Sequence, residues 1–298
     1  MKIKDMYNKN KPVISFEVFP PNKSHDIETI YGTVHELAKF NPDFISVTYG
    51  AGGSTRGNTV EIASLIKNKY NIESLAHLTC VGATKEEIDS IMKEYRKNNI
   101  ENILSLRGDF PKDMLEIDKH NGAFKYASDL TAYLKTNEFC VAGAYYPETH
   151  IENNDLMDLF NLKKKVDSGT DFLISQIFFD NEILYKFKEK TEKLGINIPF
   201  SAGVIPVTNA KQIKRITSLC NCSLPPKFQR ILDKYEDKPE ALTEAGIAYA
   251  INKLLIWFRG KLMGYICILW TKWILLKKLW IAFLILEIWI NSLKFNYL

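Results

Sequence analysis

Glu17 interrupts an apolar run and is the first residue of the chain with an obvious capacity for chemistry. It lies within VISFEVF (13–19), between Phe16 and Val18. A carboxylate in a buried strand is costly unless it is paired or protonated. The position therefore predicts either a structural ion pair or a general acid whose pKa is raised by burial.

A glycine-rich stretch, FISVTYGAGGSTRGNT (44–59), follows the second apolar run. It predicts either a tight turn before a helix capped by Ser54 or Thr55, or a backbone that approaches a cofactor closely. Its glycine spacing matches neither the Walker nor the Rossmann pattern. The turn alone therefore does not identify a ligand.

Two further runs end in polar residues. LSLRGDF (104–110) places Arg107 and Asp109 around Gly108, which predicts either a surface ion pair or contacts with a ligand. AGAYYPETH (142–150) ends on His150, next to a tyrosine pair and a glutamate. Gln176 lies in the apolar run LISQIFFD, and a buried amide needs hydrogen-bond partners that a ligand can supply.

The elements that must position these residues repeat along the chain. Short apolar runs start about 30 residues apart, the length of a βα unit, and read as strands buried on both faces. Helical spacing or capping patterns appear between them, at 27–40, 84–99 and 181–195. Since polar residues end several different strands, we expect a closed (β/α)8 TIM barrel with an atypical eighth strand and last helix, and an open doubly wound sheet is the alternative. The seven runs cover 13–19, 44–50, 73–80, 102–109, 139–146, 172–180 and 199–207.

Composition excludes several classes of protein. The 298 residues are 46% hydrophobic and 25% charged, which excludes a wholly disordered, collagen-like or coiled-coil chain. Five scattered cysteines predict no disulfide framework, so we expect a reducing cytoplasm. No histidine pair has metal-ligand spacing and Cys220-Asn-Cys222 is isolated, so no metal is expected. The net charge of +4 arises from residues after 254, which carry +5, so nucleic acid is not an expected partner.

Taken together, the motifs resemble the methylenetetrahydrofolate reductase family, in its bacterial catalytic-domain form. The matching strings follow the family's order over residues 13–254: SFEVFPP, FISVTYGAGGSTR, HLTCVGAT, NILSLRGD, YASDL, YYPETH, NLKKKVDSG, LISQIFFD and PFSAGVIPVTN. The resemblance implies a barrel that binds FAD. It implies a cytoplasmic protein that does not associate with a membrane. It also implies ping-pong hydride transfer, from NADH or NADPH to the flavin and then to 5,10-methylenetetrahydrofolate, within one-carbon metabolism and methionine biosynthesis. We further expect a homo-oligomer.

The resemblance also implies roles for individual residues. Glu17 corresponds to the general acid that protonates the folate, and Asp109 to a carboxylate near both flavin and folate. The implied substrate contacts are Glu17, Thr48, Asp109, Gln176 and Gln212. The implied flavin contacts are Thr48, Tyr49, Ala51, His77, Arg107, Gly108, Asp109, Tyr126, Ala127, Tyr146, His150, Asp158, Asn161, Lys164 and Lys165.

Residues 255–298 depart from the family's pattern. If Tyr265–Trp273 is written with A/T-rich codons and read two nucleotides later, it gives Tyr-Leu-Tyr-Thr-Met-Asp-Lys-Met, which resembles the family's last strand. We therefore expect a barrel over 1–254 and an out-of-frame segment over 255–298, in which LMGYICIL can still form the eighth strand. The alternatives are a divergent helix, a membrane-associated tail, which Lys272, Lys277, Lys278 and Glu287 argue against, and an inactive or unstable flavin-binding relic.

Overall fold

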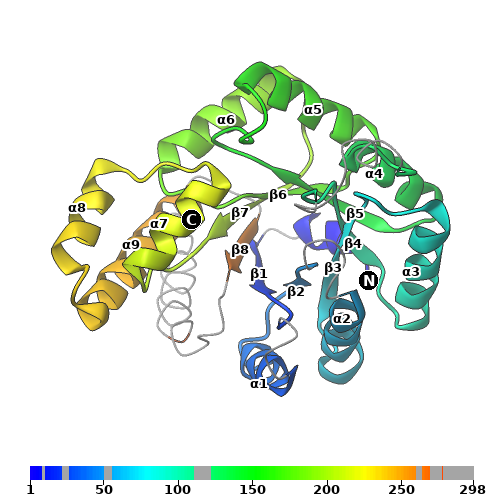
Figure 1. The fold of residues 1–298 in the computed structure, drawn as a ribbon, viewed down its shortest axis with the longest axis horizontal. Coiled ribbons are helices and arrows are strands. Elements are labelled where there is room, and N and C mark those ends of the chain that lie inside the picture. The colour runs from blue at the N-terminus through cyan, green and yellow to red at the C-terminus, as the bar shows by residue number, and fades with distance from the viewer. Residues whose placement is uncertain are drawn as a thin grey trace, which may run out of the picture.

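A closed barrel of eight parallel strands forms the centre of the computed structural model (Figure 1). The structure describes residues 1–8, 11–21, 27–49, 56–110, 122–259, 264–268 and 277, with the backbone alone at 56, 256–259 and 264–268. Each strand pairs in parallel with the next, and the eighth also pairs with the first. The strands are β1 (Val13–Val18), β2 (Phe44–Val47), β3 (Glu73–Thr79), β4 (Asn102–Leu106), β5 (Cys140–Tyr145), β6 (Phe172–Ser175), β7 (Phe200–Val204) and β8 (Gly264–Ile268).

Helices surround the barrel on its outer face (Figure 1). Those that the structure describes are α1 (Ile27–Ala38), α2 (Arg56–Tyr70), α3 (Lys85–Lys97), α4 (Ala127–Thr136), α5 (Asp155–Asp167), α6 (Asn181–Lys193), α7 (Ala210–Cys220), α8 (Pro226–Tyr235) and α9 (Pro239–Arg259). The last three pack together through an apolar cluster of their own, which includes Phe228 and Leu242. None of these described helices is long and apolar enough to cross a bilayer.

Alternation along the strands divides the apolar residues into two shells. In β2, Phe44 belongs to the cluster inside the barrel, whereas Ile45 and Val47 belong to the cluster between the strands and the helices. The same division separates Leu75 from Ala76 in β3. Because successive side chains of a strand point to opposite faces, Ser46 and His77 follow Phe44 and Leu75 toward the inside.

Local capping explains where several helices begin and end. Thr84 precedes α3, and its side chain and that of Glu87 cap each other's backbone N–H groups as the sequence predicts. The Asp180 carboxylate caps α6, and Gly195 follows that helix with a φ of +70°, a conformation that glycine adopts without strain. The predicted caps of the second helix, Ser54 and Thr55, lie outside the described residues.

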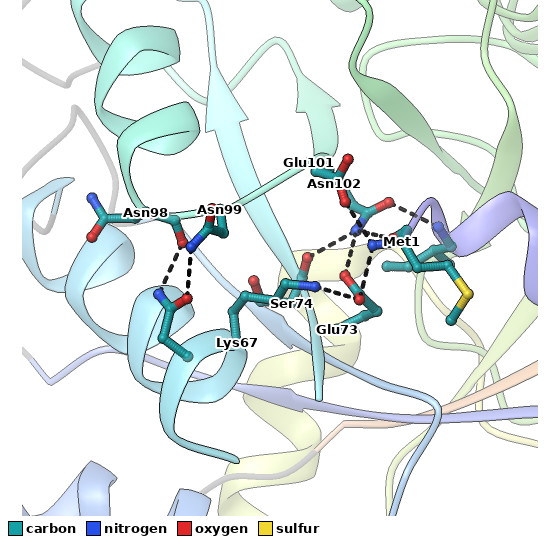
Figure 2. Close-up of polar contacts among 10 residues, drawn as sticks. Met1, Lys67, Glu73, Ser74, Asn98, Asn99, Glu101 and Asn102 are labelled. Carbon is teal, nitrogen blue, oxygen red and sulfur yellow. Dashed lines mark hydrogen bonds and ion pairs between the residues drawn. The ribbon is translucent and has the colours of Figure 1, made fainter. Parts of the chain in front are cut away.

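A short 3-10 helix, η1 (Ile3–Asn8), closes the end of the barrel where the strands begin. Ile3, Met6 and Tyr7 join the interior cluster, and the Tyr7 hydroxyl lies 2.6 Å from Ser201 Oγ of β7. Figure 2 shows the polar contacts beside this helix. There the buried Asn102 amide accepts a hydrogen bond from Ile3 N at 2.8 Å and donates to the Met1 carbonyl oxygen.

The predicted barrel is confirmed, and the open doubly wound sheet is excluded. All seven predicted strands form, and most end before the polar residues of their runs, which leave the sheet at the barrel's rim. An eighth strand forms at 264–268, within the stretch expected to supply it. The boundary expected at residue 254 falls inside α9, and a last helix after β8 lies outside the described residues apart from residue 277.

Candidate active site

The predicted site residues gather at one end of the barrel. Because all eight strands run parallel, their carboxyl ends share a rim, where barrel enzymes build their sites. Glu17 and His77 lie near the ends of β1 and β3, and Gln212 lies in the first turn of α7. The residues that directly follow strands at this rim are Thr48 and Tyr49 after β2, Arg107, Gly108 and Asp109 after β4, Tyr146 after β5, and Gln176 after β6.

Glu17, Ser46 and His77 form a connected polar group inside the barrel. Strand pairing places Glu17 opposite Ser46. His77 Nε2 lies 2.7 Å from Ser46 Oγ, and the Ser46 hydroxyl donates to Glu17 Oε2 over 3.4 Å. His77 Nε2 itself lies 3.4 Å from the same carboxylate oxygen. Glu17 is 9% exposed, so its carboxyl has polar partners within the barrel and still reaches solvent at the rim.

Arg107 takes a different partner from the Asp109 that the surface-pair interpretation suggested. Its guanidinium binds both oxygens of Glu152, Nη1 to Oε2 at 2.6 Å and Nη2 to Oε1 at 2.9 Å. Asp109 is exposed and contributes a weaker electrostatic attraction to Arg107. Gly108 adopts a φ of +86°, which glycine tolerates without strain. A Cβ at this position would lie 2.9 Å from the Thr79 side chain, so the turn requires glycine.

The loop between β5 and α5 is held by side chains that the sequence singled out. The Asp158 carboxylate accepts hydrogen bonds from the His150 backbone N–H at 3.0 Å and from Asn153 Nδ2 at 2.9 Å. The His150 ring packs edge-on against Tyr146, with 4.7 Å between ring centroids. Burial, reinforced by the nearby Asp158, raises the pKa of Tyr146 to about 12, so its hydroxyl stays protonated and able to donate.

Lys165 of α5 is half-buried, and its amine lies against the end of β5. Its Nζ donates to the Ala144 carbonyl oxygen at 2.6 Å, and its stem fits only because residue 143 is glycine, where a Cβ would lie 2.9 Å from Lys165 Cδ. Burial lowers the pKa of Lys165 to about 8, an effect that Asp158 opposes. An anion placed beside this amine would favour its charged form.

The remaining predicted residues lie around these groups at varying exposure. Tyr126 precedes α4 and is 46% exposed, and its ring lies 5.4 Å from Lys164 Nζ of α5. Ala127 is buried at the start of α4, whereas Asn161 is exposed on α5. Gln176 is half-buried, and its side-chain oxygen accepts from the Ile177 N–H. Ala51 lies outside the described residues.

Two residues of the rim were missed by reasoning from sequence. Ser46 was hidden in the apolar run FISV, although strict alternation from Phe44 would have placed it inside the barrel beside Glu17. Glu152 lies in a polar loop, 45 residues from its partner Arg107, and no local pattern marks it. Among the described residues, no group of three potential ligands could hold a metal ion.

A closed parallel barrel with ionisable side chains gathered at its carboxyl rim defines a barrel enzyme of the βα class. The family model described as methylenetetrahydrofolate reductase matches residues 2–261. The chain is 37% identical over 246 residues to the 5,10-methylenetetrahydrofolate reductase of Escherichia coli K12, and the match covers 81% of each protein. The chain belongs to the methylenetetrahydrofolate reductase family.

A plant protein is similar in sequence, and one solved structure is similar in fold alone. The Arabidopsis thaliana methylenetetrahydrofolate reductase (NADH) 1 is 35% identical over 262 residues, which are 84% of this chain but only 44% of the plant protein. A Clostridium thermocellum protein, described as binding two copies of 5-methyl-5,6,7,8-tetrahydrofolic acid, has a similar fold. That likeness has a TM-score of 0.62 at 12% identity and covers 95% of this chain and 97% of the other.

Proposed function

We propose that this protein reduces 5,10-methylenetetrahydrofolate to 5-methyltetrahydrofolate with electrons from NADH or NADPH, using bound FAD. The observation that carries the proposal is the Glu17 carboxyl, held with Ser46 and His77 inside the rim of a barrel of this family. The names of the bacterial and plant relatives describe the same reaction. The folate-binding Clostridium protein of similar fold supports the substrate class.

The residues at the rim fit a flavin dinucleotide. A diphosphate needs cations and N–H donors, and the rim offers Arg107, the buried amine of Lys165 and the N-termini of α4 and α5. The lowered pKa of Lys165 is consistent with a diphosphate site, because a bound anion would favour the charged form of this amine. When bound, FAD would supply the hydride transfer between nicotinamide and folate. Within this proposal, the flavin contacts are those that the family resemblance implies.

The proposed role of Glu17 is to hold a proton for the folate. Reduction of the methylene group requires the five-membered ring to open, and protonation of the departing nitrogen favours that opening. The Ser46 hydroxyl and His77 ring lie where they can return a proton to Glu17 between turnovers. Gln176 and Asp109 would contact the folate from the loops after β6 and β4, and Gln212 from the first turn of α7.

An inactive relic is the second candidate, and the end of the family match favours it. The match stops at residue 261, just before β8, although the backbone continues and closes the barrel. We propose that residues from about 255 onward are read out of frame, so that strand eight keeps its place while its substrate-binding side chains are lost. The nucleotide sequence across codons 250–265 tests this. A lost or gained base would support the shifted frame. If the reading frame is intact, the segment is a divergent one that is read in frame.

The test of activity separates the two half-reactions. Glu17→Gln is expected to retain FAD and to oxidise NADH with an artificial acceptor, while folate reduction falls about 100- to 10,000-fold. Glu86→Gln, an exposed carboxylate on α3, is the matched control and should keep both reactions. Near-normal folate reduction by Glu17→Gln would remove Glu17 from the mechanism. The inactive alternative would be established if the wild-type protein is yellow but does not reduce folate, and if correcting the frame restores folate reduction.

A further inference from the structure

Glu152 binds the Arg107 guanidinium, which is one of the cations that the proposed flavin would need. The guanidinium is engaged end-on by both Glu152 oxygens, at 2.6 and 2.9 Å, and its Nε donates to the Gly108 carbonyl oxygen at 3.2 Å. Of the five N–H donors of an arginine, these contacts use three. The guanidinium therefore cannot bind a phosphate in its preferred bidentate manner while Glu152 stays in place.

Glu152 is held in this position by its own loop. Its backbone N–H donates to His150 Nδ1 at 3.2 Å, and the Asp158 carboxylate anchors the His150 backbone to α5. The hydrogen bonds from Arg107, strengthened by charge, hold the pKa of Glu152 below its usual range. The carboxylate is therefore a fixed anion at the rim near neutral pH.

We propose that Glu152 is a built-in competitor for Arg107, a carboxylate that must leave the guanidinium before the diphosphate of a flavin dinucleotide can bind there. This inference rests on the proposed function, since it takes FAD as the ligand. Glu152 is 50% exposed and Arg107 is 24% exposed, so the pair is weak enough to open. The competition sets the affinity for FAD and makes that affinity depend on salt.

The test compares FAD with riboflavin, which carries no phosphate. With flavin removed from the protein, Glu152→Gln is expected to bind FAD up to about fivefold more tightly than wild type, the upper end of the range that exposed ion pairs span. Riboflavin affinity should not change. Asp167→Asn is the matched control, because it removes the same charge from the last residue of α5, where Asp167 pairs with Lys163 and not with Arg107.

Two further measurements separate competition from a structural effect. In an Arg107→Gln background, Glu152→Gln should give no gain in FAD affinity, and in the wild-type background the gain should shrink as NaCl rises from 0.05 to ~0.5 M. An unchanged or weaker FAD affinity in Glu152→Gln, or an equal gain for riboflavin, overturns the inference and leaves the proposed function standing. If the wild-type protein binds no flavin at all, both fail.

Discussion

Lys253 offers a prediction about stability, since it is a lysine buried in α9 away from the candidate active site. Its side chain is 6% exposed. Its Nζ donates to the Phe178 carbonyl oxygen and lies 4.1 Å from the centroid of the Phe178 ring. Burial lowers the pKa of Lys253 from 10.5 to about 7. We predict that Lys253→Gln, which keeps an N–H donor but no charge, stabilises the protein at pH 7.

The magnitude follows from that pKa. A fall from 10.5 to about 7 corresponds to about 5 kcal/mol of unfavourable free energy for the charged amine in the folded state. At pH 7 about half of the folded molecules already hold the neutral amine, which relieves a small part of that cost. The expected gain for Lys253→Gln at pH 7 is therefore about 4 kcal/mol.

The pH dependence has a definite sign. Between pH 7 and 10.5 the unfolded chain holds the proton and the folded protein releases it. The stability contributed by this group therefore rises with pH across that window. Below pH 7 both states are charged, and above pH 10.5 both are neutral, so the contribution is constant outside the window. In Lys253→Gln this rise should be absent.

Urea unfolding followed by circular dichroism at several pH values measures both effects. The difference in unfolding free energy between variant and wild type should be largest at and below pH 7 and approach zero near pH 10.5. Lys93→Gln, an exposed lysine on α3, serves as the control and should change stability by less than about 0.5 kcal/mol. A Lys253→Gln variant that is less stable at pH 7, or that keeps the wild-type pH dependence, would refute the reasoning.

Three other predictions concern flavin affinity and stability. FAD affinity, measured by equilibrium dialysis, should fall as pH rises above 8, because a diphosphate would favour the charged form of Lys165, so that binding takes up a proton; a pH-independent affinity would contradict this. Asn102→Ala should lose about 1–3 kcal/mol in urea unfolding, because the Ile3 N–H is left buried and unpaired, and a loss below about 0.5 kcal/mol, typical of a surface site, would argue against it. Gly246→Ala should cost about 2–3 kcal/mol, since its Cβ would lie 1.8 Å from the Val207 carbonyl oxygen. Gly32→Ala, in open space on α1, should be neutral or stabilising, and equal costs for the two would count against the predicted clash.

The strands and several helix ends were predictable because their signals are local. A strand buried on both faces must be apolar, and the capping pair of Thr84 and Glu87 lies within one helical turn. Glu17 is conspicuous for the same reason, because a carboxylate is unexpected among apolar neighbours. The shared rim then followed from parallel strands, which place the ends of distant segments side by side.

The partners of these residues could not be predicted in the same way. Arg107 pairs with Glu152 rather than with the nearby Asp109, and Lys253 reaches Phe178, 75 residues away. Each partner depends on which loop lies beside which strand, and on side-chain conformations that sequence spacing does not determine. The role of η1 was also unpredicted, because its residues become apolar partners only after the barrel has formed.

The position of η1 has a consequence for the growing chain on the ribosome. Tyr7 contacts Ser201, and the Ile3 N–H bonds to Asn102, so η1 has no complete docking site until β7 has been made. At about 5–20 residues per second, translation takes roughly 10–40 s to cover that separation. Throughout this interval Ile3, Met6 and Tyr7 remain without the interior cluster that later buries them. The residues of η1 are thus made early but settle late, and a chaperone that binds short apolar segments has that interval in which to reach them.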